Sequence, residues 1–155
     1  MDINIDIKGL ARKALNARKL SYSPYSHFKV GAVLLCCDGS FYVGANIENA
    51  AYSPTVCAEQ TAFFKAVLDG QRKFAAIFIA GSSDEAPSET GYSLPLKDFC
   101  PPCGVCRQVM REFCTDNEFK IFLVKSEDEV REYTLSELLP LGFGPDSLKK
   151  GEGAK

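Results

Sequence analysis

The spacing of apolar residues along the chain changes from block to block, and these changes predict the secondary structure. Residues 7–20 carry apolar side chains at helical spacing with Lys and Arg between them, which predicts an amphipathic helix. Two more helices are expected, over 56–69, which Gly70 ends, and over 101–114, which begins at two prolines. Pro102 is expected at the first helical position, where its missing amide hydrogen costs nothing.

Short apolar runs rich in Val, Ile, Leu and Phe predict the strands. The first two flank Asp38-Gly39-Ser40, which predicts a β-hairpin whose first arm is buried on both faces. From the second run onward, strands alternate with the later helices, and this order predicts parallel pairing through right-handed crossovers. The expected strands are 29–37, 41–49, 74–82, 119–126 and 130–134.

Together these elements predict an α/β fold in three layers, α/β/α, with a mixed five-stranded sheet between the helices. The segment 84–98 is polar and broken by Pro and Gly, so we expect an exposed insertion there, and one turn of helix at 136–140. A chain of 155 residues can bury a core without disulfides. We expect a single domain over 1–155, with its core at 7–148 and a polar tail at 149–155.

Charge and composition exclude several kinds of partner. Lys and Arg number 18 against 20 Asp and Glu, so a nucleic-acid-binding surface is not expected, and the basic face of 7–20 is interpreted as solvated. No run of apolar residues is long enough for a transmembrane helix, and the first ten residues lack the apolar stretch of a signal peptide. Seven cysteines without an export signal predict reduced thiols and a cytoplasmic location.

Candidate metal ligands stand at the starts of the second and third helices. Cys103 and Cys106 are three residues apart, hence neighbours on one helical face and spaced to share a metal ion. Side chains in a first helical turn lean toward the amino terminus, so Cys57 and Glu59 can both reach a point just ahead of their helix. We therefore expect three sulfurs and one carboxylate around one Zn²⁺, with both helix dipoles favouring the thiolates.

The fourth coordination position decides between a catalytic and a structural zinc, because a structural site fills it with protein and a catalytic site leaves it to water. His27, the chain's one histidine, lies on a Pro-rich loop, and two prolines separate Cys100 from the helix start. Both stay open as a fourth ligand, but an open site is favoured. Zinc lowers the pKa of bound water, and Glu59 beside it would accept the proton.

This pattern resembles the zinc nucleoside and nucleobase deaminases, and within them the small homotetrameric cytidine deaminases. The resemblance extends from about residue 7 to 148 and implies the cytidine-deaminase-like version of the α/β/α fold. The motifs that carry it are YSHFKVGA at 25–32, Asn46-x-Glu48, Cys57-Ala58-Glu59, PCGVCRQ at 102–108 and LLPLGFGPDSL at 138–148.

The resemblance implies roles for individual residues. Cys57, Cys103 and Cys106 would bind Zn²⁺, with Glu59 as the proton shuttle. Asn46 and Glu48 would hold the ribose 3′-hydroxyl, since an amide and a carboxylate together satisfy a hydroxyl group. A homotetramer with shared active sites is also implied. The implied substrate contacts are Phe28 against the pyrimidine ring, Asn46, Glu48, Ala58 and, entering a neighbouring subunit's pocket, Tyr52 and Phe143.

Gln60 departs from the family's pattern, in which arginine commonly follows the catalytic glutamate and donates hydrogen bonds to the ligand sulfurs. A glutamine amide still donates but brings no positive charge, so the zinc should be less electrophilic. The expected function is hydrolytic deamination of cytidine and 2′-deoxycytidine in pyrimidine salvage. Two alternatives stay open: deamination of another base-bearing substrate, such as a nucleoside antibiotic or a polynucleotide, and a non-catalytic zinc module.

Overall fold

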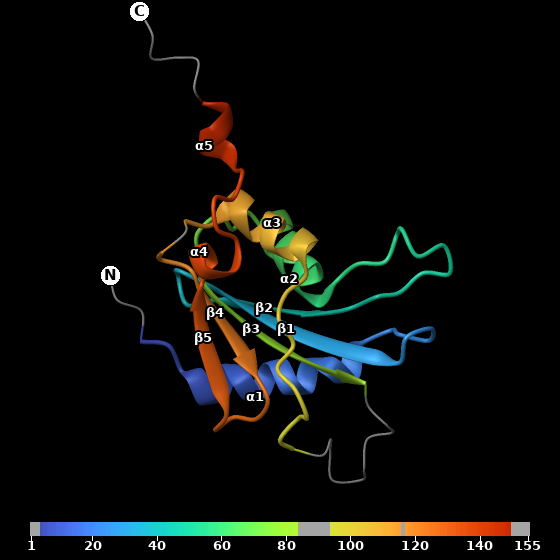
Figure 1. The fold of residues 1–155 in the computed structure, drawn as a ribbon. Coiled ribbons are helices and arrows are strands. Elements are labelled where there is room, and N and C mark those ends of the chain that lie inside the picture. The colour runs from blue at the N-terminus through green and yellow to red at the C-terminus, as the bar shows by residue number, and fades with distance from the viewer. Residues whose placement is uncertain (1–3, 84–93, 116, 150–155) are drawn as a thin grey trace, which may run out of the picture.

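The computed structural model describes residues 4–83, 94–115 and 117–149. Its elements are α1 (Ile7–Ala17), a 3₁₀ turn (Arg18–Leu20), β1 (Phe28–Cys36), β2 (Phe41–Ala45), α2 (Ala58–Leu68), β3 (Phe74–Ser83), α3 (Gly104–Phe113), β4 (Lys120–Val124), β5 (Val130–Thr134), α4 (Leu135–Leu138) and α5 (Pro145–Leu148). The sheet has the strand order β2-β1-β3-β4-β5 and lies between α1 on one face and α2 and α3 on the other (Figure 1). This confirms the predicted α/β fold with a mixed five-stranded sheet.

Strand pairing differs from the prediction at one point. The β3–β4 pair is parallel, as expected for a crossover through α3, whereas β1 pairs antiparallel with both β2 and β3. The crossover through α2 thus joins strands that run parallel but lie on either side of β1, so the expected direct pairing between them is wrong. The reason is the character of β1: an apolar strand buried on both faces needs a partner along each edge, and the hairpin supplies only one.

Alternation along β3 shows how the two faces of the sheet are filled. Ile77 and Ile79 pack in the cluster beneath α2 and α3, whereas Phe78 lies in the cluster beneath α1. Phe78 stacks on Phe122 of β4 with the ring centroids 4.4 Å apart. The apolar runs of the sequence therefore fill two separate cores, one on each side of the sheet.

Two peripheral segments depart from expectation. Of the insertion expected at 84–98, residues 84–93 lie outside the described part, but Leu96 is buried and its N–H donates to Lys125 O at 2.9 Å. Leu96 therefore packs against the domain, whereas its neighbours Leu94, Pro95, Lys97 and Asp98 are exposed as expected. Helix α5 has no counterpart among the predicted elements and projects away from the sheet (Figure 1). Of the expected tail, 150–155 are likewise not described, and no described helix has the length and hydropathy to cross a membrane.

Candidate active site

The site is built on the starts of α2 and α3, whose first residues are each preceded by a cysteine. Cys57 precedes α2, and its N–H donates to Gln60 Oε1 at 2.9 Å. Cys103 precedes α3, and its sulfur accepts from the N–H of Cys106 at 3.4 Å. Both cysteines thus occupy N-cap positions. The prediction that Pro102 is the first helical residue is wrong, because the cap at Cys103 places the helix start at Gly104.

The position of α2 is fixed by its close approach to β2. A Cβ at Gly44 would lie 2.1 Å from Ala58 O and 2.7 Å from Ala62 N, so only glycine lets the helix come this near. Thr61 then connects the two elements, since its Oγ1 accepts from Ala45 N and donates to Ala45 O, both at 3.0 Å. These contacts place the first turn of α2, with Cys57 and Glu59, against the sheet.

The three predicted zinc ligands lie together. The sulfurs of Cys57, Cys103 and Cys106 are all within 4.8 Å of one another, and the Cys57–Cys103 separation is 3.8 Å. Tetrahedral zinc with Zn–S bonds of about 2.3 Å requires sulfurs about 3.8 Å apart, so this donor set fits the ion. Among the described residues no other group of three or more His, Cys, Asp or Glu donors is found, and neither His27 nor Cys100 belongs to this one.

The thiols of the cluster differ in how readily they lose a proton. Hydrogen bonding with Cys106 and Cys103 lowers the pKa of the Cys57 thiol to about 6, although burial opposes this shift. The same hydrogen bond to Cys57, together with burial, raises the pKa of Cys106. Cys57 therefore loses its proton more readily than Cys106. All seven cysteines are free thiols.

Glu59 is a buried carboxyl group beside these thiols. Only 4% of Glu59 is exposed, and burial raises its pKa to about 7, with a smaller contribution from the charge of Cys57. A carboxyl group with such a pKa both accepts and releases protons near neutral pH. Glu59 lines a cavity of about 180 Å³. The other lining residues are Val30, Asn46, Thr55, Val56, Cys57, Ala58, Cys100, Pro101 and Cys103.

Asn46 lies in the cavity wall, but most of its side-chain amide is occupied by the chain itself. Its Oδ1 accepts from Val30 N at 2.9 Å and Ser21 Oγ at 2.6 Å, and its Nδ2 donates to Phe28 O at 2.8 Å. One Nδ2 hydrogen remains for a ligand. Asn46 is not a strand residue as predicted: β2 ends at Ala45, and the chain leaves the sheet to form isolated bridges through Ile47.

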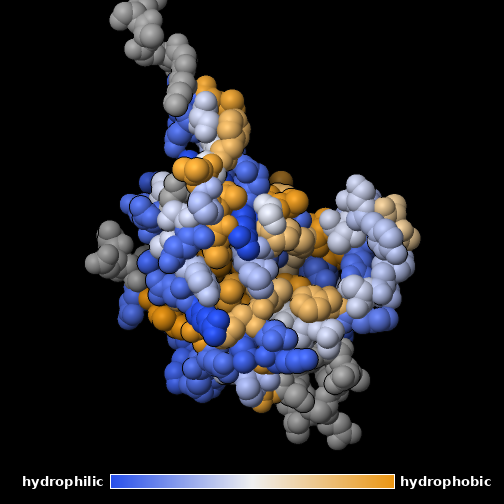
Figure 2. Space-filling model, viewed as in Figure 1, coloured by the Kyte–Doolittle hydropathy of each residue, from blue (hydrophilic) through white to orange (hydrophobic). Residues whose placement is uncertain are grey.

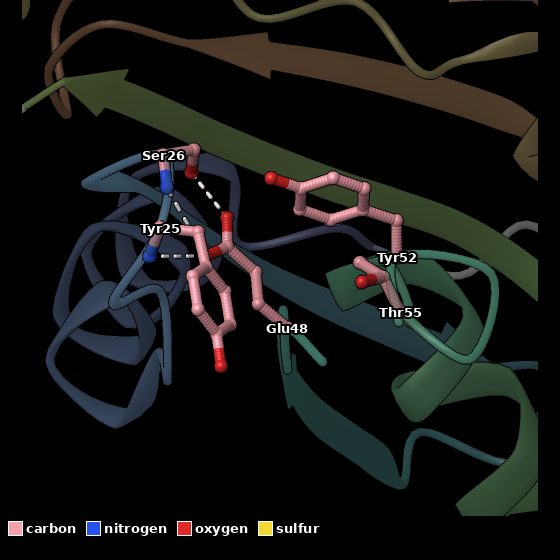
Figure 3. A pocket seen from close by; sticks show the side chains of 5 residues that line it. All are labelled: Tyr25, Ser26, Glu48, Tyr52 and Thr55. Atoms are coloured by element: carbon pink, nitrogen blue, oxygen red, sulfur yellow. Dashed lines mark hydrogen bonds between the residues drawn. The ribbon is translucent and has the colours of Figure 1, made fainter. Parts of the chain in front are cut away.

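Glu48 and Tyr52 line a second, more open cavity of about 380 Å³, together with Tyr25, Ser26 and Thr55 (Figure 3). The Glu48 carboxylate accepts from the N–H groups of Tyr25 and Ser26, at 2.9 and 3.2 Å, and from the Ser26 hydroxyl. Tyr52 is 73% exposed, and its ring meets Tyr25 edge-on with the centroids 6.2 Å apart. Thr55 lines both cavities, so they adjoin.

The remaining predicted substrate contacts are Ala58, Phe28 and Phe143, and they differ in whether they line a cavity. Ala58 is wholly buried and lines the smaller cavity, the one of about 180 Å³, whereas Phe28 is not among the residues that line either cavity. The Phe28 ring edge and Cys100 Sγ both reach Gly81, where a Cβ would lie 3.1 and 2.8 Å from them, so Phe28 flanks the cavity wall at Cys100. Phe143 is 59% exposed on the segment before α5 and lies outside both linings.

Sequence reasoning assigned no role to Thr55 or Ser26. Nothing in the local pattern singles out Thr55, which reaches both cavities only because Ile47 and Val56 bridge. Ser26 lies within the YSHF motif, two residues before Phe28, and this proximity could have indicated a role for it from the sequence. Cys100 was considered only as a ligand, whereas it forms part of the cavity wall, and burial raises the pKa of its thiol to about 12.

A cluster of three thiols that fits zinc, with two of its cysteines in the wall of a cavity that a buried proton carrier also lines, is the equipment of a zinc-dependent hydrolase. Residues 5–121 match the family described as "Cytidine and deoxycytidylate deaminase zinc-binding region". The chain belongs to this family.

Individual relatives agree with that assignment. The chain is 42% identical over 144 residues to a cytidine deaminase from Sporosarcina psychrophila, which covers 93% of this chain and 96% of the relative. A cytidine deaminase from Halalkalibacterium halodurans is also 42% identical over 144 residues, 93% of this chain and 98% of the relative. Among solved structures, cytidine deaminase from Burkholderia pseudomallei superposes with a TM-score of 0.72 at 39% identity, covering 87% of this chain and 97% of that one.

Proposed function

We propose that this chain is a zinc-dependent cytidine deaminase, which converts cytidine and 2′-deoxycytidine to uridine and 2′-deoxyuridine with release of ammonia. The observation that carries the proposal is the pairing of Glu59, a carboxyl group with a pKa of about 7, with three sulfurs spaced for zinc. Two of those sulfurs, of Cys57 and Cys103, belong to residues that line the same cavity as Glu59. The zinc-binding family and the full-length relatives support the same reaction.

Cys57, Cys103 and Cys106 would hold the zinc ion. Zinc bound there supplies Lewis-acid chemistry, lowering the pKa of water so that a nucleophile for C4 of the base exists at neutral pH. Glu59 accepts the proton that this water loses and delivers it to ring N3. The C4–O bond would form as N3 gains this proton. Glu59 would then take the remaining hydroxyl proton from the oxygen on C4 and pass it to the amino group, so that the C4–N bond breaks, a carbonyl forms at C4 and ammonia leaves. Burial of Glu59 keeps bulk water from competing for these protons.

The sugar would lie where the two cavities adjoin, between Asn46 in the wall of the smaller cavity and Glu48 in the wall of the larger one. Asn46 has one amide hydrogen left for a hydroxyl oxygen, and the carboxylate of Glu48 accepts a hydroxyl hydrogen. Glu48 is ionised at neutral pH, as carboxyl groups of ordinary pKa are, and hydrogen bonds from Ser26 and the loop backbone lower its pKa further. A negative charge at this point disfavours a phosphorylated sugar, so free nucleosides are the expected substrates. Ala58 and Phe28 would contact the base.

A homotetramer with shared active sites completes the proposal. Leu141, Phe143 and Leu148 are 104%, 59% and 77% exposed on the projecting carboxy-terminal segment, and apolar surface runs along one side of α5 (Figure 2). Exposed apolar surface of this kind is typical of protein–protein interfaces. Phe143 would enter the pocket of a neighbouring subunit, as would Tyr52. Free thiols support a cytoplasmic location, where the reaction would serve pyrimidine salvage.

The test is a substrate panel. Purified zinc-loaded protein is incubated with cytidine, 2′-deoxycytidine, cytosine, adenosine and deoxycytidylate, and ammonia is measured. Release from both free nucleosides, with little from cytosine or deoxycytidylate, supports the proposal. Activity confined to another compound indicates a deaminase with a different substrate, and no release from any compound favours a non-catalytic zinc module.

A further inference from the structure

The side chain of Ser26 hydrogen-bonds both to the proposed sugar-binding carboxylate and to the backbone of the proposed base-binding residue. Its hydroxyl donates to Glu48 Oε1 (Figure 3) and accepts from Phe28 N at 3.0 Å. The N–H of Ser26 donates to the other carboxylate oxygen at 3.2 Å. Ser26 thus contacts Glu48 twice and Phe28 once.

The segment between these contacts has a backbone conformation that needs support. His27 lies between Ser26 and Phe28 with φ of 56°, a left-handed value that costs of order 1 kcal/mol or more outside glycine. Its N–H donates to Ser23 O at 3.0 Å. On the far side, Phe28 O accepts from Asn46 Nδ2 at 2.8 Å. The backbone of Phe28 is therefore fixed at its N–H by Ser26 and at its carbonyl by Asn46.

We propose that Ser26 is a positioning residue whose hydroxyl couples Glu48 to Phe28, so that the sugar-binding and base-binding groups are aligned together. This inference rests on the proposed function and deepens it. Without the hydroxyl, the carboxylate loses a donor and the N–H of Phe28 loses its acceptor. Substrate binding should then weaken, while Glu59 and the three thiols, which Ser26 does not contact, keep their chemistry. The Ser26 hydrogen bond is also the largest cause of the lowered pKa of Glu48, which agrees with a strong contact.

The primary test separates binding from turnover. In Ser26→Ala the KM for cytidine should rise about tenfold, the usual scale for losing a hydrogen bond to a charged group, while kcat stays within about twofold. Ser26→Thr, which keeps the hydroxyl, should restore KM. The matched control is Ser40→Ala, which removes an equivalent serine–carboxylate contact, to Asp38 Oδ1 at 2.6 Å, in the hairpin turn. Ser40 lines neither cavity, so its variant should keep the original KM.

A double-mutant cycle tests whether Ser26 acts through Glu48. If it does, the rise in KM for Ser26→Ala combined with Glu48→Ala should be clearly smaller than the product of the two single rises. If Ser26→Ala does not fold, Ser26→Cys keeps the size of the side chain with a weaker donor and should give an intermediate rise.

The outcomes also distinguish this inference from the proposed function. If the original protein releases no ammonia from cytidine, the proposed function fails and the inference fails with it. If the original protein is active, three results overturn the inference alone: an unchanged KM in Ser26→Ala (or in Ser26→Cys, where Ser26→Ala does not fold), a loss confined to kcat, or purely multiplicative effects in the cycle.

Discussion

The substitution Gly44→Ala adds a single methyl group that should distort the metal site by shifting α2, although Gly44 itself is not part of that site. A Cβ there would lie 2.1 Å from Ala58 O, whereas ordinary contact begins at 3.4 Å, so α2 must move by about 1.3 Å. The nearest atom and Ala62 N are helix backbone and cannot rotate aside. Overpacking of this kind costs about 3 kcal/mol, which for a chain of this size lowers the melting temperature by about 6–12 °C. The same shift moves Cys57 well beyond the tolerance of about 0.2 Å for a zinc ligand.

The assay for Gly44→Ala combines thermal unfolding with zinc titration against a competing chelator. We expect the lower melting temperature. We also expect zinc binding to weaken by about ten- to a hundredfold, which is the usual loss when the groups that hold metal ligands in place are disturbed. Gly39→Ala is the matched control: with φ of 87° at Gly39 it should cost about 1 kcal/mol, but a Cβ there meets nothing within 4 Å. It should lower stability and leave zinc affinity unchanged. Zinc affinity in Gly44→Ala equal to that of the original protein would refute the role assigned to this approach.

Two further predictions concern α2. Glu59→Ala should abolish ammonia release and leave zinc bound, because the carboxylate moves protons and is not a ligand; normal release by this variant would remove Glu59 from the mechanism. Gln60→Arg should raise zinc retention or turnover by adding positive charge beside the thiolates, and should cost about 1 kcal/mol of stability, because arginine cannot accept the hydrogen bond from Cys57 N. Unchanged metal affinity together with unchanged kinetics would count against this view of Gln60.

Most of the elements, though not α5, and the pairing of Cys103 with Cys106 could be predicted because each rests on local information. Helical spacing and the Cys103–Cys106 separation are properties of short stretches of chain, and the three sulfurs do lie together. The pairing of β1 with β3 could not be read this way, because strand order depends on which edge of a buried strand is free after the hairpin forms.

The site's lining was harder to predict, because it depends on where the chain leaves its regular elements. Asn46 and Glu48 line adjoining cavities only because β2 ends early and Ile47 bridges two other segments. Ser26 acquires its contacts through the left-handed turn at His27, which side-chain patterns do not specify. Motifs therefore predicted which cysteines lie together better than they predicted which residues line the cavities.

The most direct measurement is X-ray absorption at the zinc edge of the metal-loaded protein. Three cysteines with one position left to solvent predict three sulfurs at about 2.3 Å and one oxygen at about 2.0 Å. Four sulfurs, as recruitment of Cys100 would give, or an imidazole nitrogen from His27, would show a metal closed off by protein and contradict hydrolysis at this site.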